Sequence, residues 1–425
     1  MGRRATRRHV LLAGASAGLS GIVAGCLSET DRFDERERID DRSYQTRPDG
    51  VAQFRRSLEN WGYEPNETVP DSVEQEWRLP EHNTHTHNAA KASAVPLGED
   101  GVAFPGDTGD VSAISSDGEI LWRGETGAGG PGIHGTPVVA DGRVYIGAYD
   151  GVCYAFDAET GEERWSTDLG DAIGSSPKYD GDRLFVAVEY DDPEGNLFAL
   201  DPETGDVVWE EPAHRPTGHP HCTPAIDPDA GRLVLGSNDG TLYGWEYPSL
   251  EFAWSFDTNP ENDSNGEIKG PIAAYDGGAF FGSWDDHIYR VDLEDGTLDW
   301  AFRTGRYAMA GPGIDPVRHA VFVGCHDGRM YALDPDTGDP FWRFSTDAPL
   351  TGSVAVCADR IVFGSKDRTL YALDSWTGDE VWHVDHDGFV TSAPLVHNGA
   401  IYYAERAPDP ENGDADGGAY KLVSA

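Results

Sequence analysis

The feature that most constrains this chain is a segment repeated at a fixed period of 40 to 46 residues. The stretch from Gly328 to Trp342 recurs from Arg368 to Trp382, and weaker copies end at Trp122, Trp165, Trp209, Trp254 and Trp300. Within each unit, short β-prone runs alternate with Asp-Gly and Thr-Gly turns, which predicts four short antiparallel strands. Because one such unit cannot bury its apolar faces alone, we expect the units to pack side by side in an all-β propeller.

Eight tryptophans close the fourth strands and therefore give the number of blades. After Trp382 the chain offers only three strands, at residues 391–397, 400–404 and 418–423, whereas the strand around Trp77 precedes the first complete unit. We expect the Trp77 strand to complete the last blade and close the ring, because closure removes exposed sheet edges. The prediction is an eight-bladed propeller of four-stranded blades over residues 71–425. The tryptophans are expected to be structural wedges between blades: Trp77, Trp122, Trp165, Trp209, Trp254, Trp300, Trp342 and Trp382.

The repeat also carries a family resemblance. Its core, Tyr331-Ala332-Leu333-Asp334, followed by Thr337-Gly338 and then Trp342, resembles the tryptophan-docking repeat of the pyrroloquinoline quinone (PQQ) dehydrogenases. It is also similar to the repeat of the lipoprotein of the bacterial barrel-assembly machinery, which is eight-bladed as well. The resemblance covers residues 77–425 and implies the fold, but it leaves the function open.

Two functions follow from the resemblance. One is a non-catalytic binding or assembly scaffold without a cofactor; the other is a PQQ- and calcium-dependent dehydrogenase that oxidises alcohols or sugars. The sequence lacks an adjacent Cys-Cys pair, has few long insertions, and places no set of Asp, Glu and Asn at the channel mouth. We therefore favour the scaffold, with extracytoplasmic proteins or peptides, or a small ligand at the channel mouth, as partners, and we expect a monomer.

The charge of the chain is strongly acidic. It holds 75 acidic against 32 basic residues, which gives a formal net charge of -43. Such a surface repels nucleic acid and destabilises the folded state by self-repulsion unless salt screens it. The composition predicts a protein of a salt-loving organism; the alternative is a specialised cation-binding surface.

The first 26 residues have the pattern of an export signal. The stretch around Arg7-Arg8 resembles a twin-arginine motif, and Val23-Ala24-Gly25-Cys26 resembles a lipobox. We expect cleavage before Cys26, lipidation of its sulfur, and anchoring on the outer side of the cytoplasmic membrane. A simple N-terminal membrane anchor is the alternative. Residues 27–70 are predicted to be an acidic tether that allows a short helix around residues 53–61.

One face of the propeller is expected to carry the functional residues. The loops that lead into the innermost strands and the second-to-third-strand hairpins emerge on this face, which holds the longest loops and nine of the fourteen histidines. Aligning the blades places His134, His221 and Lys269 at the channel mouth, with His219 and His326 nearby. This basic arc could bind an anionic ligand, a metal or an acidic peptide, or it could simply close the mouth with hydrogen bonds.

Three further candidate sites are weaker. His82, His85 and His87 have a metal-ligand spacing but stand on a loop without a carboxylate. The loop at residues 409–416 alternates oxygen donors that could bind calcium, although a solvated acidic loop is the simpler interpretation. Asn66 and Asn262 fit the glycosylation sequon.

Overall fold

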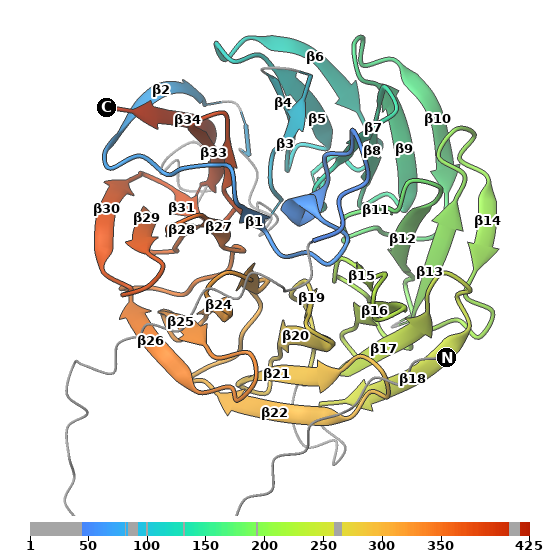
Figure 1. The fold of residues 1–425 in the computed structure, drawn as a ribbon. Coiled ribbons are helices and arrows are strands. Elements are labelled where there is room, and N and C mark those ends of the chain that lie inside the picture. The colour runs from blue at the N-terminus through green and yellow to red at the C-terminus, as the bar shows by residue number, and fades with distance from the viewer. Residues whose placement is uncertain are drawn as a thin grey trace, which may run out of the picture. The chain divides into compact units, whose positions relative to one another are not determined.

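Each repeat unit forms one blade of a ring, and eight blades surround a central channel in the computed structural model (Figure 1). The structure describes residues 45–80, 82–83, 92–98, 101–130, 132–192, 194–258, 266–407 and 417–425. The predicted signal peptide with Cys26 and the first part of the predicted tether lie outside these residues. Within the described ranges, the one helical element is the 3-10 turn η1 (Phe54–Arg56). That part of the chain contains no helix with the length and apolar character needed to cross a membrane.

Every blade is built on four antiparallel strands, as predicted, of which the first lines the channel and the last lies at the rim; two of the eight sheets contain a fifth strand. The first four blades consist of the following strands: β3 (Val95–Leu97), β4 (Gly101–Pro105), β5 (Asp110–Ile114) and β6 (Ile120–Glu125); β7 (Val138–Ala140), β8 (Arg143–Gly147), β9 (Val152–Asp157) and β10 (Glu163–Asp168); β11 (Lys178–Tyr179), β12 (Leu184–Glu189), β13 (Gly195–Leu200) and β14 (Val207–Glu210); β15 (Ala225–Asp227), β16 (Arg232–Gly236), β17 (Thr241–Glu246) and β18 (Phe252–Asp257).

The next three blades repeat this arrangement with the following strands: β19 (Ala273–Tyr275), β20 (Gly278–Gly282), β21 (His287–Asp292) and β22 (Leu298–Arg303); β23 (Gly313–Asp315), β24 (Ala320–Cys325), β25 (Arg329–Leu333) and β26 (Pro340–Ser345); β27 (Ala355–Cys357), β28 (Arg360–Gly364), β29 (Thr369–Asp374) and β30 (Glu380–Asp385). The middle strands are buried on both faces, whereas the rim strands alternate exposed and partly buried positions. The core of each blade therefore lies in its two middle strands and in their contacts with neighbouring blades.

The eighth blade joins the two ends of the propeller. It consists of β31 (Phe389–Val390), β32 (Leu395–His397), β33 (Ala400–Arg406), β34 (Gly418–Ser424) and β2 (Val73–Leu79). β2 pairs antiparallel with β34, with Trp77 opposite Lys421 and Val73 opposite Ser424. The predicted closure of the ring by the Trp77 strand is confirmed, and Figure 1 shows the blue strand beside the red one.

The repeated tryptophans dock each blade on the next. The indole Nε1–H donates to a carbonyl oxygen of the neighbouring blade's last turn over 2.8 to 3.1 Å in seven pairs: Trp77 to Ser116, Trp122 to Ala158, Trp165 to Pro202, Trp254 to Leu293, Trp300 to Pro335, Trp342 to Ser375 and Trp382 to Pro70. The indoles also cover a turn glycine with positive φ, such as Gly118 under Trp77. A side chain on Gly118 would come within 2.8 Å of that indole, so glycine is required there.

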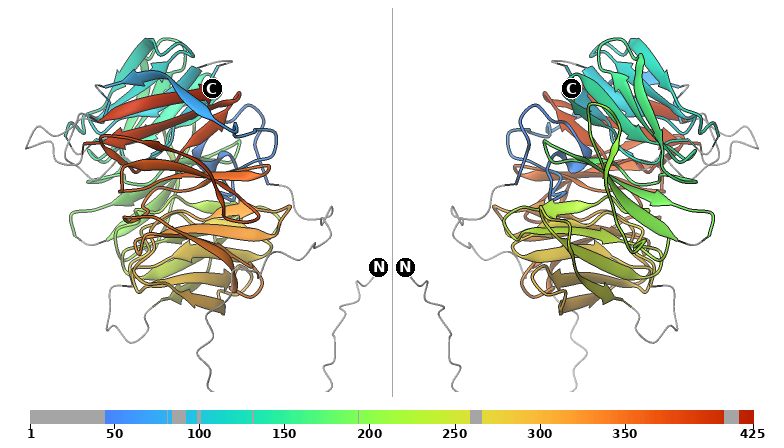
Figure 2. Two further views of the ribbon diagram at one scale, coloured as in Figure 1. Left: turned by 90° about the vertical axis from the view of Figure 1, so that its left-hand side faces the viewer. Right: turned by 90° about the vertical axis from the view of Figure 1, so that its right-hand side faces the viewer.

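Residues 45–70, here called the inner segment, cross the centre of the ring and then run out to the rim at Pro70, instead of forming a tether (Figure 1). The edge-on views of Figure 2 show them on one face of the ring. The segment pairs in turn with the innermost strands of seven blades through hydrogen bonds of 2.7 to 3.0 Å: Ala52 with Val139, Gln53 with Tyr179, Leu58 with Ile226, Glu59 with Ala274, Trp61 with Ile314, Gly62 with Val356 and Glu67 with Asn398. Its β1 (Tyr63–Glu64) adds a parallel strand to β27.

The inner segment differs from the predicted tether because it is apolar as well as charged. Phe54, Leu58, Trp61 and Tyr63 are buried. The innermost strands present unpaired backbone groups towards the channel, and an extended segment satisfies them. The helix predicted around residues 53–61 is only the single turn η1, since the segment extends to follow the circle of strands.

Two buried cations fasten this segment to the ring. The Arg55 guanidinium donates to the carbonyl oxygens of Pro312 and Val354, both at 2.5 Å. The Lys178 ammonium donates to the carbonyl oxygens of Phe54 and Ser57 and to the Asn60 side chain. Burial lowers the pKa of Arg55 to about 9 and that of Lys178 to about 7. The inner segment thereby closes one end of the channel, and the other end stays open as a cavity.

Candidate functional site

The open end of the channel forms a cavity of about 300 Å³. Its lining comes from all but two of the blades and consists of His134, Tyr149, His221, Lys269, Trp284, Tyr307, Met309, His326, Thr351, Lys366, Thr391 and Arg406. A smaller space of about 50 Å³ continues below it, and Phe54 of the inner segment is part of its lining. We call the larger space the mouth cavity.

The structure brings most of the predicted arc together. His134, His221 and Lys269 line both the mouth cavity and the space below it, and His326 lines the mouth cavity. His134 packs against Tyr149 with ring centroids 3.9 Å apart and the rings tilted by 45°, and His326 packs against Tyr307 at 4.1 Å with a tilt of 34°. His219 is not part of the lining; it lies beside His221.

Two cations of the mouth cavity were not predicted. Lys366 follows β28 and Arg406 ends β33, so both stand where the second strand of a blade reaches the mouth. Burial lowers the pKa of Lys366, and the charge of Arg406 lowers it further. Burial also lowers the pKa of Arg406, whose guanidinium lies 5.2 Å from the centre of the Phe389 ring.

A sequence signal for this second ring of residues exists. In five blades the second strand ends in Gly-x-Xaa-Asp, where Xaa is the residue that reaches the mouth: Tyr149, Asn238, Trp284, His326 and Lys366. All of these except Asn238 line the mouth cavity. Aligning the blades on this motif, as well as on the first strand, would have predicted the additional cation Lys366.

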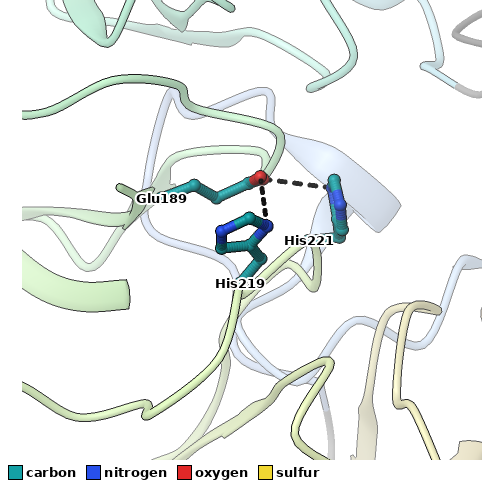
Figure 3. A group of neighbouring side chains, drawn as sticks. All are labelled: Glu189, His219 and His221. Atoms are coloured by element: carbon teal, nitrogen blue, oxygen red, sulfur yellow. Dashed lines mark ion pairs between the residues drawn. The ribbon is translucent and has the colours of Figure 1, made fainter. Parts of the chain in front are cut away.

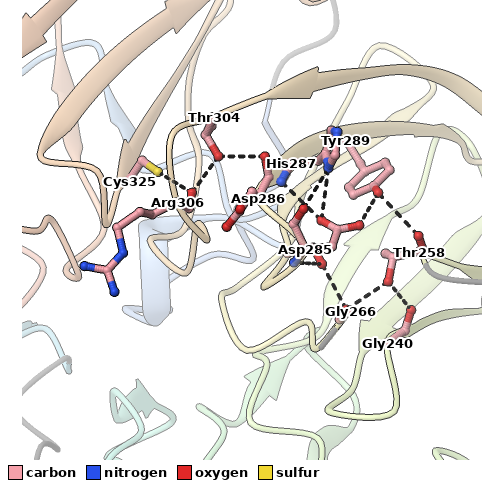
Figure 4. A network of polar contacts seen from close by, with 11 residues as sticks. Gly240, Thr258, Gly266, Asp285, Asp286, His287, Tyr289, Thr304, Arg306 and Cys325 are labelled. Atoms are coloured by element: carbon pink, nitrogen blue, oxygen red, sulfur yellow. Dashed lines mark hydrogen bonds and ion pairs between the residues drawn. The ribbon is translucent and has the colours of Figure 1, made fainter. Parts of the chain in front are cut away.

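The aspartate of the motif makes these hairpins rigid. In each of the five blades its carboxylate accepts a hydrogen bond from a tyrosine hydroxyl four residues later: Asp150 from Tyr154, Asp239 from Tyr243, Asp285 from Tyr289, Asp327 from Tyr331 and Asp367 from Tyr371. Figure 4 shows the network around Asp285, in which Thr258 donates to the carbonyl oxygens of Gly240 and Gly266 at 2.9 and 2.8 Å. In four of the five blades the side chain before the aspartate lines the mouth cavity.

Several polar groups of the lining lack a hydrogen-bond partner among the described residues. Trp284 Nε1, Thr351 Oγ1 and Arg406 Nε are buried without one. Lys269 lies 3.9 Å from the centre of the Trp284 ring, and its ammonium pairs with Glu267 at 2.6 Å. Because buried donors without acceptors are costly, these groups indicate a place for a ligand that accepts hydrogen bonds.

A carboxylate and two histidines meet at the wall of the mouth cavity (Figure 3). Glu189 ends β12, and both histidines stand on the connection from β14 to β15. Glu189 Oε1 lies 3.1 Å from His221 Nδ1, and Glu189 Oε2 lies 3.7 Å from His219 Nδ1. Burial raises the pKa of Glu189 to about 7, and the charges of His219 and Lys269 partly oppose this.

The other metal-ligand candidates do not form a site among the described residues. His82 is buried, with Nε2 at 2.9 Å from the carbonyl oxygen of Pro105 and its ring edge-on to Phe104. His85, His87 and the acidic loop at 409–416 lie outside the described residues, as does Asn262. Asn66 of the other sequon is exposed.

The family described as "Outer membrane protein assembly factor BamB", a PQQ-type repeat family, matches residues 70–221, 150–274, 193–343 and 326–421. The chain belongs to this family. Among its relatives, the outer membrane protein assembly factor BamB of Shewanella oneidensis is 24% identical over 315 residues, which cover 69% of this chain and 75% of that protein.

Two solved structures share the fold of this family member. BamB from Moraxella catarrhalis superposes with a TM-score of 0.61 at 19% identity and covers 83% of this chain and 98% of that one. The quinohemoprotein alcohol dehydrogenase from Comamonas testosteroni superposes with a TM-score of 0.70 at 13% identity and covers 87% of this chain and 80% of that one. At these identities the likeness concerns the fold alone.

Proposed function

We propose that this propeller is a non-catalytic binding scaffold whose mouth cavity holds an anionic segment of an extracytoplasmic protein. Membership of a family described by an assembly factor supports a scaffold. One observation carries the choice of ligand: Lys269, Lys366 and Arg406 gather in one cavity of a chain whose formal net charge is -43. Only five lysines occur in the sequence, and two of them line this cavity.

The lining suits carboxylates in particular. Lysine and arginine form charge-assisted hydrogen bonds with carboxylates, and the free donors on Trp284 and Thr351 add neutral contacts. Aromatic rings of Tyr149, Trp284 and Tyr307 supply flat apolar walls. A volume of about 300 Å³ is at the lower end of ligand cavities, which fits a few residues of a peptide and excludes a folded domain.

The surrounding acidic surface makes the cavity selective. A cationic cavity inside an acidic molecule attracts a short anionic segment that reaches the mouth, while long polyanions such as nucleic acid are repelled by the rest of the surface. The cavity is also closed from below by the inner segment, so a ligand enters and leaves on one face. These features support capture of a partner's loop or terminus.

The competing function is a PQQ- and calcium-dependent dehydrogenase. The cationic and aromatic lining suits an anionic quinone, but calcium takes six to eight oxygen ligands. No carboxylate is part of the described lining, and the nearby Glu189 faces two histidines. The residues present therefore do not fit the calcium that this chemistry requires, and we derive no reaction from it.

The location of the protein is part of the same proposal. Export by the twin-arginine route, lipidation of Cys26 and a monomeric state on the outer side of the membrane would place the mouth cavity among extracytoplasmic proteins. These features rest on the residues of the first 26 positions and on the charge of the chain.

Peptide binding tests the proposal directly. Labelled peptides rich in Asp and Glu, and matched peptides with Asn and Gln, would be titrated with the purified propeller and followed by fluorescence anisotropy. We expect binding of the acidic peptides, weakened at least about 100-fold by the double substitution Lys269→Gln and Lys366→Gln, since charged hydrogen bonds are worth about 1.5 kcal/mol or more each.

The matched control removes the same charge elsewhere. Arg303 and Arg343 are exposed on rim strands, so Arg303→Gln with Arg343→Gln should leave binding within about twofold, because screened surface charges contribute little. Equal weakening by both pairs of substitutions would overturn the cavity as the binding site. If the protein retained added PQQ with calcium and oxidised alcohols or sugars in a dye-linked assay, the scaffold function would be rejected in favour of the dehydrogenase.

A further inference from the structure

The group of Glu189, His219 and His221 offers three ligand atoms that lie within 4.8 Å of one another. Glu189 stands at the end of a strand, whereas both histidines stand on the connection that leads into β15. The backbone of Glu189 forms an antiparallel bridge with Ala172, and the Glu189 side chain is 6% exposed. Figure 3 shows the two imidazoles converging on the carboxylate from one side.

The hydrogen bonds of His219 determine which of its nitrogens is free to bind. Its Nε2 lies 2.8 Å from the carbonyl oxygen of Tyr190 and 3.3 Å from that of Asp192. Carbonyl oxygens only accept hydrogen bonds, so Nε2 carries the proton and donates. In the neutral ring Nδ1 then has a lone pair, and this lone pair faces Glu189 Oε2 at 3.7 Å.

Two acceptors facing each other at a buried carboxylate are unfavourable unless a proton or a metal ion lies between them. Metal-bound histidines have this same arrangement, in which one nitrogen donates to a backbone carbonyl and the other holds the ion. Glu189 Oε1 is buried without a hydrogen-bond partner, although His221 Nδ1 lies 3.1 Å away. His221 Nδ1 also lies 3.3 Å from the Tyr149 hydroxyl, a contact that an ion bound to this nitrogen would replace.

The spacing of the atoms agrees with a transition-metal ion. Zinc binds histidine nitrogen and carboxylate oxygen at about 2.0 to 2.1 Å in a tetrahedron, which separates neighbouring ligand atoms by about 3.3 Å. The two nitrogen-to-oxygen distances of 3.1 and 3.7 Å, each to a different oxygen of Glu189, lie near this value, and the three ligand atoms lie within 4.8 Å of one another. Two imidazoles with one carboxylate suit zinc and related divalent ions, whereas calcium and magnesium prefer oxygen ligands.

We propose that Glu189, His219 and His221 form a binding site for a divalent transition-metal ion of the zinc class in the wall of the mouth cavity. Three protein ligands leave a fourth position open. Because His221 also lines the mouth cavity, this position faces the space in which the proposed partner binds. The ion would add positive charge to the cavity and offer a direct ligand position to a carboxylate of the partner.

The site can be tested without knowing the partner. Propeller purified without a histidine tag and freed of metal with a chelator would be titrated with Zn²⁺ by calorimetry and with Co²⁺ by visible absorption, where bound Co²⁺ gives intense d–d bands. We expect one tight site per chain. Glu189→Gln, His219→Gln and His221→Gln should each weaken binding by more than about 100-fold, because even loss of a supporting hydrogen bond costs 10- to 100-fold.

Two controls locate the site. His383→Gln removes an exposed histidine that pairs with Glu380 at 2.7 Å on a rim strand, and it should leave the tight site unchanged. His319→Gln changes a second group, with Asp276 and Asp336, that could also hold an ion. Loss of the tight site in His319→Gln, with binding retained in Glu189→Gln, would overturn the assignment.

The remaining outcomes are also decisive. Absence of a tight site in the metal-free wild type, or its persistence in both Glu189→Gln and His219→Gln, refutes the proposal. His219 is partly exposed, so its substitution should leave the near-UV circular dichroism unchanged and keeps the test valid if Glu189→Gln folds poorly. Peptide titrations in chelator test the cationic cavity separately, so failure of the metal site leaves the scaffold proposal intact.

Discussion

Replacing Arg55 with alanine should loosen the inner segment from the ring and lower the free energy of unfolding by about 3 to 5 kcal/mol. The guanidinium donates within the segment to the carbonyl oxygens of Asn60 and Trp61, and across to those of Pro312 and Val354. Those two cross contacts join the segment to the sixth and seventh blades. Arg55 therefore links chain positions that are 257 and 299 residues apart.

The magnitude follows from the carbonyl groups that the substitution leaves behind. The Trp61 carbonyl keeps a second donor, the amide of Ile314 at 3.0 Å. Three others, on Asn60, Pro312 and Val354, lose the guanidinium, and an unsatisfied buried group costs about 1 to 3 kcal/mol. Partial entry of water and relief of the buried charge reduce the sum, which gives the range of about 3 to 5 kcal/mol.

Urea unfolding in molar salt, followed by tryptophan fluorescence and near-UV circular dichroism, measures this loss. Arg123→Ala is the control, because Arg123 is 42% exposed and lies 3.9 Å from Asp110; its expected effect is below about 0.5 kcal/mol. A loss below about 1 kcal/mol in Arg55→Ala would refute the reasoning. It would mean that the inner segment is an appendage and not part of the cooperative fold.

Three other predictions concern ring closure, pH and salt. Gly118→Ala, under Trp77 at the contact between the last and first blades, should lower the free energy of unfolding by about 2 to 4 kcal/mol, as much as Gly161→Ala under Trp122. A much smaller loss at Gly118 would show that the contact that closes the ring is not equivalent to the contacts within it. Burial raises the pKa of Glu59 from 4.5 to about 7, so between these pH values the folded state keeps a proton that the unfolded state has released. The free energy of unfolding should therefore fall as the pH rises from about 4.5 to 7, by up to about 3 kcal/mol more in the wild type than in Glu59→Gln. Identical pH curves for the two proteins in urea unfolding would contradict this. The melting temperature should rise steeply from low to molar KCl as the net charge of -43 is screened, and a flat response would exclude charge repulsion as the dominant cost.

The architecture could be predicted because its signals are local and repeated. The blade period, the Asp-Gly turns and the position of Trp77 each occupy a few residues, and eight approximate copies of one unit average out the uncertainty of any single copy. The arc of His134, His221 and Lys269 was placed by the same alignment. Lys366 and Arg406 lie at the end of the second strand, outside the part of the repeat that precedes the first strand, although Lys366 stands in a motif that five blades share.

The inner segment could not be predicted from periodicity, because it has none. Its backbone pairs with innermost strands by hydrogen bonds that any extended chain can make, so these contacts leave no residue pattern. The apolar residues Phe54, Leu58, Trp61 and Tyr63 were the available signal, since a solvated tether has no reason to carry four large apolar side chains within ten residues.

The sequence by itself determined the number of blades and how the ring closes, since both depend on spacing along the chain. Only the tertiary structure decided which side chains share the channel. Glu189 meets His219 and His221 across two neighbouring blades, and the mouth cavity collects one to three residues from each of six blades. A ring brings together residues with the same position in each repeat, but their chemistry differs from blade to blade. The charge of the cavity is therefore a property of the closed ring and of no single repeat.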